Sequence, residues 1–486
     1  MNVQTPLSPQ RAERWVLILS SLASLMVALD VLVVSTALGA IRHHFGASIN
    51  ELEWTVNAYA LSFAVLLIPA SALGDRFGRR RLFAAGLGLF VAGSAACALA
   101  PSAGLLIAAR AAQGAAAALV APLSLSLLSA AFGPRRRARA LGIYSGVTGL
   151  AVLGGPVVGG AVTQGLAWQW VFWINVPIGL LAIPLVLTRI AESRGPRVRF
   201  DGPGLVLITG AALGIVWGLM RGNAAGWGSP EVLLTLAGGA VLLVGFLIWE
   251  GRVGEPMLPL RLFASRGFSA GNVTNFLLSA CLFSAVFFMA QFQQLALGQG
   301  PLDSGLRLLP WTATLFVVAP IAGSLVSRIG ERPLVVAGLL LQAAGMGWIA
   351  MVATPGMAYL EMVAPLAIAG AGISMAIPAA QNAIMNAVAP GDLGDASGVS
   401  MMTRQLGGVF GVAIGAAVFT GAGGYASATA FGAGFGPAIG VAAAFSLLGA
   451  ICAAALPRRA THPSPATAGP AITPAPAPVF AESSVS

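Results

Sequence analysis

Two residues of opposite charge, Asp30 and Arg110, stand inside long apolar stretches of the sequence. An ionised residue within a membrane span is costly unless it is paired or wetted, so its presence marks a candidate functional site. Counted from Val16, Asp30 lies about 21 Å along its helix. Arg110 lies about 22 Å above the same face of a ~30 Å apolar core if its helix descends from Leu105. We therefore expect the two charges to meet at one depth.

Three interpretations of this pair remain open. Asp30 could carry a proton, it could contact a cationic substrate directly, or the pair could be a static salt bridge that only fixes helix packing. We expect Asp30 to be the only acid deep in a span, because Glu361 begins only a few residues into its own apolar stretch.

A second set of charged residues lies in the connections between apolar stretches. Asp75 is surrounded by arginines, and an acid there could cap the start of a neighbouring helix. A cluster that ends at Arg139 corresponds to an acidic segment later in the chain. We predict a gate that closes the cytoplasmic side, formed by Asp75, Arg76, Arg79, Arg139, Asp392 and Asp395. For Arg79 and its two neighbours the alternative is a role in topology and in anchoring to anionic lipid.

One apolar stretch contains a proline among glycines. Proline removes a backbone hydrogen bond and glycine allows close approach, so Gly155, Pro156, Gly159 and Gly160 predict a pliable, leak-tight helix interface. Ordinary packing through small residues is the alternative.

Other polar groups lie within or at the ends of apolar stretches. Each is more often a hydrogen-bonding link between helices than a ligand. The charge of Arg404 could simply extend to the membrane surface. The candidate substrate contacts are Asn57, Tyr59, Gln113, Gln291, Gln294 and Arg404.

The composition identifies lipid as the solvent of this chain. Of its 486 residues 57% are hydrophobic and only 9% are charged, whereas charged residues approach a quarter of a soluble domain. The net charge of +10 comes from arginines in short clusters between apolar runs, which form no stripe for nucleic acid. The three cysteines lie inside apolar runs without metal-binding spacing, so we expect neither a metal nor a cofactor.

Apolar runs of about 17 to 25 residues predict an all-α integral membrane protein with fourteen transmembrane helices. The predicted spans are 15–38, 52–73, 82–100, 104–129, 139–163, 168–188, 204–220, 231–249, 268–291, 305–325, 333–352, 358–380, 397–418 and 437–456.

The arginines predict the orientation, because they accumulate in short cytoplasmic loops. With both termini in the cytoplasm, only Arg42, Arg221 and Arg307 face outward, while Arg110 and Arg404 lie within spans and every other arginine faces inward. We expect a multi-pass protein of a bacterial inner membrane.

Two pairs of loops indicate an internal repeat. Arg76 and Gly78 match Arg328 and Gly330 at an offset of 252 residues, and a second pair of loops matches at 256. Two six-helix halves alone need an offset near 190, so two additional helices must lie between them. The predicted domains are an N-terminal half at 1–190, a linker with two helices at 191–267, a C-terminal half at 268–456 and a disordered cytoplasmic tail at 457–486. Such duplication is typical of transporters.

The motifs resemble those of the major facilitator superfamily, specifically its fourteen-helix drug:proton antiporter branch. G-D-R-F-G-R-R-R, R-A-A-Q-G, G-P-V-V-G-G, W-Q-W-V-F-W-I-N-V-P-I-G and T-R-Q-L-G-G each resemble a family motif, and together they cover nearly the whole chain to residue 456. The first-helix motif keeps Asp30 but has Leu32 where threonine is usual and Gly39 where proline is usual. The signature loop has Ser71 in place of its leading glycine.

This resemblance implies proton-coupled export of amphipathic drug-like or antibiotic compounds by alternating access. The partners are then protons, a small amphipathic substrate and membrane lipid, and we expect a monomer that is not an enzyme. A proton-coupled uptake carrier for a metabolite is the alternative. A membrane-embedded enzyme or scaffold is a weaker one, since the sequence shows no catalytic cluster of His, Cys or paired carboxylates.

Overall fold

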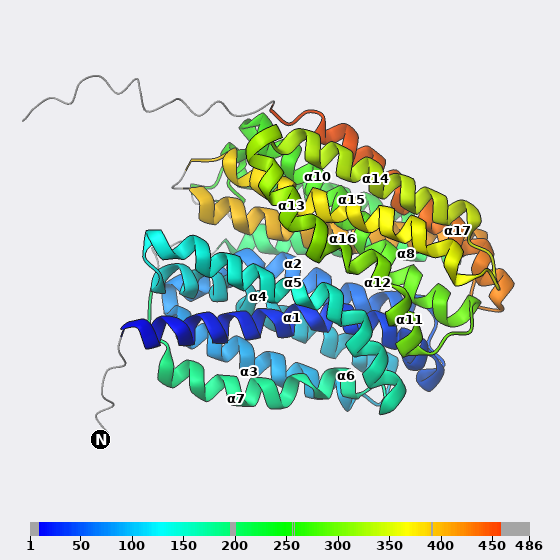
Figure 1. The fold of residues 1–486 in the computed structure, drawn as a ribbon, viewed down its shortest axis with the longest axis horizontal. Coiled ribbons are helices and arrows are strands. Elements are labelled where there is room, and N and C mark those ends of the chain that lie inside the picture. The colour runs from blue at the N-terminus through cyan, green and yellow to red at the C-terminus, as the bar shows by residue number, and fades with distance from the viewer. Residues whose placement is uncertain (1–8, 195–200, 255, 257, 390–391, 458–486) are drawn as a thin grey trace, which may run out of the picture.

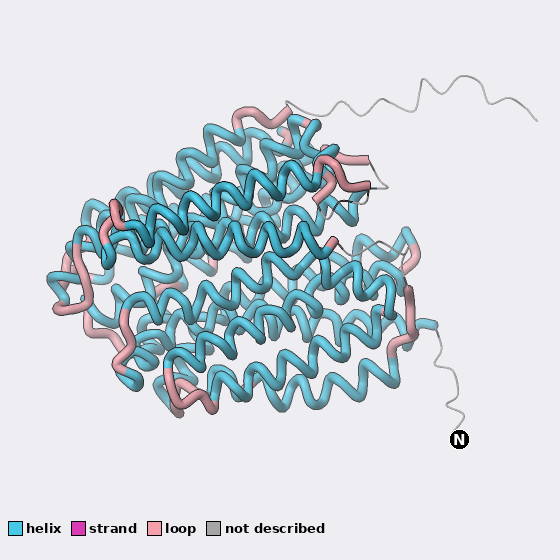
Figure 2. Tube along the Cα trace, turned by 180° about the vertical axis from the view of Figure 1, so that it is seen from behind, coloured by secondary structure: helices cyan, strands magenta, loops and turns pink. Residues whose placement is uncertain are grey.

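The computed structural model describes residues 9–194, 201–254, 256, 258–389 and 392–457. Within these residues the chain is helical and contains no strand (Figure 2). The helices run along the long axis of the molecule and the loops gather at its two ends (Figures 1 and 2). The predicted tail at 457–486 and part of the predicted linker, residues 195–200, lie almost wholly outside the described residues.

The first group of helices occupies the lower part of Figure 1. It consists of α1 (Pro9–Phe45), α2 (Ile49–Phe77), α3 (Arg79–Ala98), α4 (Ala103–Ala131), α5 (Pro134–Gly165), α6 (Trp170–Trp173) and α7 (Asn175–Arg189). A hairpin follows, formed by α8 (Gly202–Ala225) and α9 (Pro230–Glu250). Helix α8 packs on both α2 and α16, so the hairpin lies against the seam between the two groups.

The second group occupies the upper part of Figure 1. It consists of η1 (Leu260–Ala264), α10 (Arg266–Gln291), η2 (Phe292–Ala296), α11 (Pro301–Arg307), α12 (Leu309–Thr312), α13 (Thr314–Ile329), α14 (Glu331–Val352), α15 (Tyr359–Asn386), α16 (Leu393–Ala422) and α17 (Ala428–Ala453). Helix α1 begins and α17 ends at the left of Figure 1. We call this end of the bundle, which also holds the α2–α3 turn, the arginine-rich end, and the other the opposite end.

All fourteen predicted spans lie on these helices. Twelve helices within the described residues are long and apolar enough to cross a membrane, and counting each of two bent pairs as one span gives up to fourteen. One pair, Asn50–Leu67 with Pro69–Phe77, bends by 52°, and the other, Arg139–Ala151 with Gly154–Gly165, by 40°. Both breaks lie near a proline, which removes a backbone hydrogen bond.

The first repeat identified in the sequence corresponds to two similar turns. Gly78 separates α2 from α3 with φ 112°, and Gly330 separates α13 from α14 with φ 83°. A positive φ favours glycine, since a Cβ atom would clash with the backbone. The turns therefore need the glycines that the repeat aligns.

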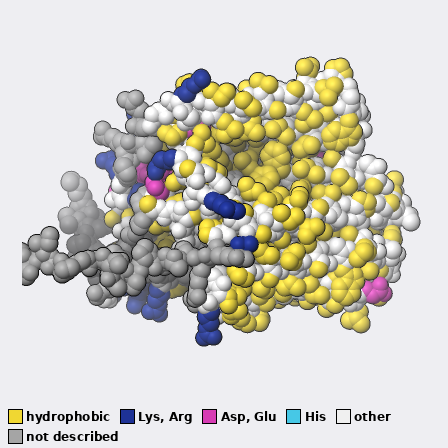
Figure 3. All heavy atoms as spheres, turned by 90° about the horizontal axis from the view of Figure 1, so that it is seen from above, with side chains coloured by type: hydrophobic (Ala, Val, Ile, Leu, Met, Phe, Trp, Pro, Cys, Tyr) yellow, Lys and Arg dark blue, Asp and Glu magenta, His cyan; other side chains and the backbone are white. Residues whose placement is uncertain are grey.

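The outer surface of the bundle is apolar between its ends. Leu181, Leu234 and Val241 are 70%, 72% and 69% exposed. Figure 3 shows hydrophobic side chains over most of one face, with the arginines in its left half. Leucine and valine side chains so exposed are stable in contact with lipid chains, so this surface fits the membrane interior.

Small residues bring helices α14 and α15 into close contact. A Cβ atom on Gly372 would lie 2.5 Å from the backbone nitrogen of Gln342 and would also strike the Gly338 carbonyl. Backbone atoms cannot move aside as a flexible side chain can, so the contact depends on glycine.

We predict that Gly372→Ala destabilises the protein by about 1–3 kcal/mol, because the added methyl group overpacks the α14–α15 contact. Thermal unfolding of the purified protein in detergent measures this change. Gly347→Ala on α14 is the matched control, since a Cβ there meets nothing within 4 Å. Equal melting temperatures for both variants would contradict the close contact.

Candidate functional site

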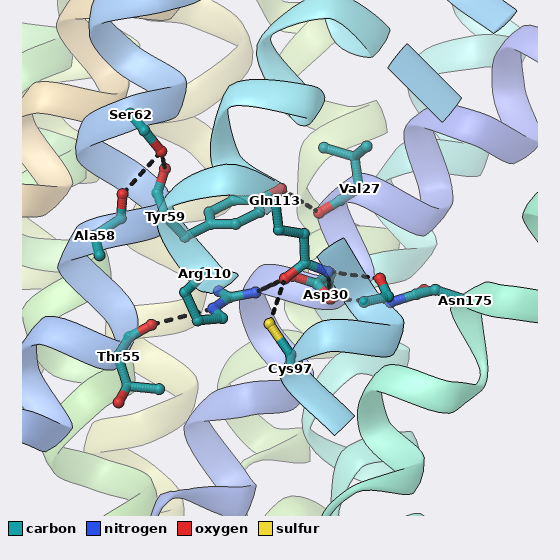
Figure 4. Close-up of polar contacts among 11 residues, drawn as sticks. Val27, Asp30, Thr55, Ala58, Tyr59, Ser62, Cys97, Arg110, Gln113 and Asn175 are labelled. Carbon is teal, nitrogen blue, oxygen red and sulfur yellow. Dashed lines mark hydrogen bonds and ion pairs between the residues drawn. The ribbon is translucent and has the colours of Figure 1, made fainter. Parts of the chain in front are cut away.

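Asp30 and Arg110 form an ion pair in the interior of the first group of helices. Asp30 on α1 is 2% exposed and Arg110 on α4 is 1% exposed. Arg110 donates from Nη1 to the Asp30 carboxylate (Figure 4). The expected meeting of the two charges is confirmed.

The Asp30 carboxylate accepts hydrogen bonds from two further side chains. Gln113 Nε2 on α4 donates to Oδ1 at 2.8 Å and Asn175 Nδ2 on α7 donates to the same oxygen at 2.9 Å. Both amides also donate to the Ser94 hydroxyl on α3, at 2.8 and 3.3 Å. Three donors therefore converge on one buried carboxylate.

The guanidinium of Arg110 also contacts residues of α2, α4 and α6. Its Nε donates to the Thr55 carbonyl on α2 at 3.1 Å, and Nη1 donates to Gln113 Oε1 at 2.7 Å. The ring of Tyr59 lies 4.2 Å from its central carbon, and the ring of Phe172 lies 5.7 Å away. Such cation–π contacts stabilise a desolvated charge.

The carboxylate of Asp30 connects several helices through one charge. Asp30 is the only ionic partner of Arg110 among the described residues. Without this charge Arg110 would keep only the Thr55 carbonyl, Gln113 and the two rings as contacts, so the contacts among α1, α2 and α4 depend on the charge of Asp30.

Three members of this network were not predicted as site residues. Asn175, Ser94 and Thr55 lie on α7, α3 and α2, far from Asp30 in sequence. Asn175 lies within the family motif W-Q-W-V-F-W-I-N-V-P, and this position could have indicated that it belongs to the site. Ser94 and the Thr55 carbonyl carry no sequence signal, because serine and backbone groups are common in any span.

The glycine and proline segment of α5 lies where the two groups of helices touch. Cβ atoms on Gly155 and Gly159 would strike Leu32 and Val33 of α1. A Cβ on Gly160 would lie 2.7 Å from Leu302 Cα of α11 in the second group. Gly305 of α11 packs equally closely against the backbone of Pro156. The segment predicted as a helix interface therefore joins the two groups at the opposite end.

Other contacts join the groups at the same end. Gln294 Nε2 on η2 donates to the Thr36 carbonyl of α1 at 2.9 Å. The backbone nitrogen of Leu302 donates to Gln164 Oε1 of α5 at 3.1 Å. The guanidinium of Arg42 lies 4.6 Å over the Tyr425 ring, in the connection between α16 and α17.

At the arginine-rich end the predicted gate residues contact residues of the same group of helices. Asp75 Oδ1 accepts from Arg79 Nε at 2.7 Å, and Arg76 lies against the ring of Phe77. Arg80 and Arg81 face Glu192, which follows α7, at 3.7 and 3.8 Å.

The acidic gate residues have a partner in the segment before α10. Arg261 lies 2.7 Å from Asp392 and 3.7 Å from Asp395. The hydrogen bond from Arg261 lowers the pKa of Asp392. Arg139 is exposed and makes no ion pair with the described residues. Among the residues that the structure describes, no ion pair links the first group to the second at this end.

The candidate substrate contacts do not converge on one pocket. Tyr59 and Gln113 belong to the Asp30 network. Asn57 faces Met220 of α8, and Gln291 accepts from Tyr425 at the opposite end. Arg404 on α16 is exposed. No group of three or more His, Cys, Asp or Glu side chains that could hold a metal occurs in the described part of the chain.

That Asp30 is the only acid deep in a span stays a prediction, but Asp30 is not the only buried acid. Glu53 on α2 is 1% exposed. It stands two residues into its predicted span, where sequence alone indicates a wet interface. Tertiary packing at the opposite end covers it, and no hydrogen bond to Glu53 occurs within the described residues. Glu361, by contrast, is exposed as expected.

Comparison with known proteins identifies the family of this chain. The model of the Major Facilitator Superfamily matches residues 20–412 and 273–482. A tetracenomycin C resistance and export protein of Streptomyces glaucescens is 36% identical over 84% of this chain and 77% of its own length. A cephamycin export protein of Amycolatopsis lactamdurans is 35% identical over 92% of this chain and 93% of its own. A peptide transporter crystallised with sulfate shares the fold, with TM-score 0.66, 15% identity and coverage of 93% of this chain and 100% of its own.

The chain belongs to the Major Facilitator Superfamily, and its fold is that of a membrane transporter. It is a multi-pass protein of the inner membrane. The family predicted from the motifs is confirmed, as is the likeness to drug resistance and export proteins.

We predict that Arg110→Ala destabilises the protein by about 3–5 kcal/mol, since it leaves the Asp30 carboxylate buried without a counterion. Thermal unfolding in detergent at neutral pH measures the loss. Arg136→Ala, which removes an exposed pair with Glu13, is the control and should cost less than about 1 kcal/mol. If Arg110→Ala unfolds like the control, the pair does not stabilise the interior.

Proposed function

We propose that the protein is a proton-coupled secondary exporter of amphipathic drug-like or antibiotic compounds. It exchanges protons moving inward for substrate moving outward by alternating access. The export and resistance relatives support the direction and the substrate class. The buried Asp30–Arg110 network supports the proton coupling, and it is the observation that carries the proposal.

The proposed topology has fourteen spans in two six-helix halves, with α8 and α9 as the two additional helices. Both termini and the arginine-rich end face the cytoplasm, because arginines accumulate on that side of a membrane. The contacts of Gly160 and Gln294 at the opposite end then close the extracellular side. The structure corresponds, in this proposal, to a state that is open to the cytoplasm.

The proposed coupling follows from the hydrogen bonds of Asp30. In its ionised form the carboxylate holds α1, α4 and α7 together through Arg110, Gln113 and Asn175. Protonation after exposure to the more acidic exterior weakens these bonds and frees Arg110. Return to the cytoplasmic side releases the proton and restores the ionised form, which attracts cationic substrates.

The gate residues act in the other half of the cycle. When the extracellular side opens, the cytoplasmic ends of the two halves approach. The cluster around Arg139 then meets the acidic segment of Asp392 and Asp395, while the Asp75–Arg79 pair holds the α2–α3 turn rigid.

We predict that Asp30→Asn abolishes proton-driven accumulation of drug, because an amide has no second protonation state. Some energy-independent exchange of drug should remain. The measurement uses inside-out vesicles with an acid interior, in which an exporter loads drug and releases protons. Glu361→Gln, an exposed acid, is the control and should transport at wild-type rates.

The same vesicles separate the proposal from its alternatives. Asp30→Asn vesicles that still concentrate drug under an imposed pH difference would contradict the coupling role of Asp30. An uptake carrier would give the opposite direction of transport. Under the imposed pH difference, inside-out vesicles of the wild type would then lose a solute and right-side-out vesicles would load it. A panel of antibiotics tested in a host that lacks its own pumps then gives the substrate range.

We predict that Gly160→Val slows transport at least tenfold, since the side chain would strike the backbone of α11 and prevent closure of the extracellular side. Initial rates in vesicles of equal protein content measure this loss. Gly165→Val lies at the same end of α5, where a Cβ meets nothing within 4 Å, and should transport normally. Equal rates for the two variants would remove the closing role from this contact.

A further inference from the structure

Glu53 differs from the other two buried acids of the described chain, Asp30 and Glu250, each of which accepts a hydrogen bond. It is 1% exposed, yet its side chain has no ion pair and no hydrogen bond among the described residues. Its Oε2 atom is fully buried without a partner. Burying an ionised carboxylate without a counterion costs several kcal/mol, so the closed structure favours the neutral acid.

Glu53 lies at the contact between the two halves. It stands in the second turn of α2, at the end opposite the arginines. The same helix face carries Asn57, which faces Met220 of α8, and Leu61, which packs with Val409 of α16 in the second half. The hydroxyl of Tyr425, in the connection between α16 and α17, lies at the same end, where burial raises its pKa while Arg42 and the hydrogen bond to Gln291 lower it.

Tyr425 is the centre of this contact. Its hydroxyl donates to Gln291 of α10, and its ring lies 4.6 Å from the guanidinium of Arg42 on α1. Arg42 Nη2 also reaches the Tyr425 carbonyl at 3.5 Å. The contact therefore spans both halves.

The elements around this part of α2 offer no partner to Glu53. None of their ionisable groups makes an ion pair or hydrogen bond with it in the described structure. These groups are Asp30 and Arg42 on α1, Cys97 on α3, Arg110 on α4, Arg221 on α8 and Tyr425 after α16. Arg110 is committed to Asp30, and Arg221 to Glu231.

Water can approach this contact from the extracellular side of the proposed topology. A cavity of about 510 Å³ is lined by Arg42 and Tyr425 together with Ser48, Asn223 and Ala426. The last three are exposed, so the cavity reaches the surface. Asn50 of α2, about one turn before Glu53, is also part of this lining.

We propose that Glu53 is a second proton-binding residue, and that it must take up a proton from the extracellular side before the two halves can close there. When that side is open, water reaches Glu53 and it ionises at neutral pH. Closure removes the water and supplies no counterion, so the proton must come first. Asp30 keeps three donors and can be buried as an anion, whereas Glu53 cannot.

This inference extends the proposed function, because it adds a step to the same transport cycle. External acid would speed the return of the empty protein to its cytoplasm-open state. The external pH would thereby act on a gate at the surface, while the proton motive force acts on Asp30 in the interior. Glu53 positions the gate and does not contact the drug.

The test measures closure directly, without drug or gradient. Nitroxide labels at Gly104 and Thr354, both exposed at the opposite end on different halves, report the distance across the extracellular side. The three native cysteines are replaced by alanine, and the labelled protein is placed in lipid nanodiscs. We expect the distance to lengthen in the wild type as pH rises between about 5 and 8, as Glu53 ionises in the open state.

Three variants identify the titrating group. Glu53→Gln should give the short distance at every pH, and Glu53→Asp should keep a pH response. Glu361→Gln, an exposed acid at the same end, should behave like the wild type. Asp30→Asn should retain the response, since its charge lies in a different network. A wild-type response in Glu53→Gln, or no response in the wild type, would overturn the inference.

Infrared spectra give a second readout should Glu53→Gln fail to fold. The wild type at acid pH should show a protonated carboxylic acid band that shifts in Glu53→Asp, and an unshifted band would overturn the assignment. The labels and spectra require no transport. The two proposals can therefore fail separately. If vesicles do not accumulate drug but the distance still depends on Glu53, the proposed function is refuted and the gate is not. If vesicles accumulate drug but the distance does not depend on Glu53, only the gate is refuted.

Discussion

The cost of placing charge inside a lipid-surrounded bundle governs this protein. Arg110 and Asp30 are almost fully buried, and neither could remain charged there without the other. Four helices beyond α1 contribute to their network. The contributing groups are the backbone carbonyl of Thr55 and the side chains of Ser94, Gln113 and Asn175. The hydrogen bonds that hold these helices together thus end on one carboxylate, and in the proposed function the same bonds respond to its protonation.

Glycine contacts determine how the halves meet. Gly160 and Gly305 bring α5 and α11 together through backbone atoms, which leaves no room for side-chain adjustment. A contact of this kind is either formed or absent, since close-packed backbones do not deform gradually. Interfaces held by small residues and a few hydrogen bonds can separate at moderate cost, which suits the alternating access proposed for this protein. In the proposed role of Glu53, binding of a proton favours the arrangement in which the two halves are in contact.

The α8–α9 hairpin lies against the seam between the halves. Ala212 and Val216 of α8 pack with Leu61 of α2 and Val409 of α16 in one apolar cluster. Asn223 also donates to Thr420 of α16 at 2.7 Å. The outer face of α9 is among the most exposed in the bundle, and its leucines and valines face lipid. The hairpin therefore covers α2 and α16 on the lipid side.

The sequence by itself determined the elements of this protein and its family. Apolar runs predicted the long helices, since lipid requires every backbone group to be paired within its own segment. Motifs around Arg76, Arg110 and Pro156 identified the superfamily, and helical rise predicted that Asp30 would meet Arg110. Tertiary structure alone decided which polar groups surround that pair, and it buried Glu53. Both outcomes depend on helices far apart in sequence, whose facing sides follow from close packing and not from the period of any one helix.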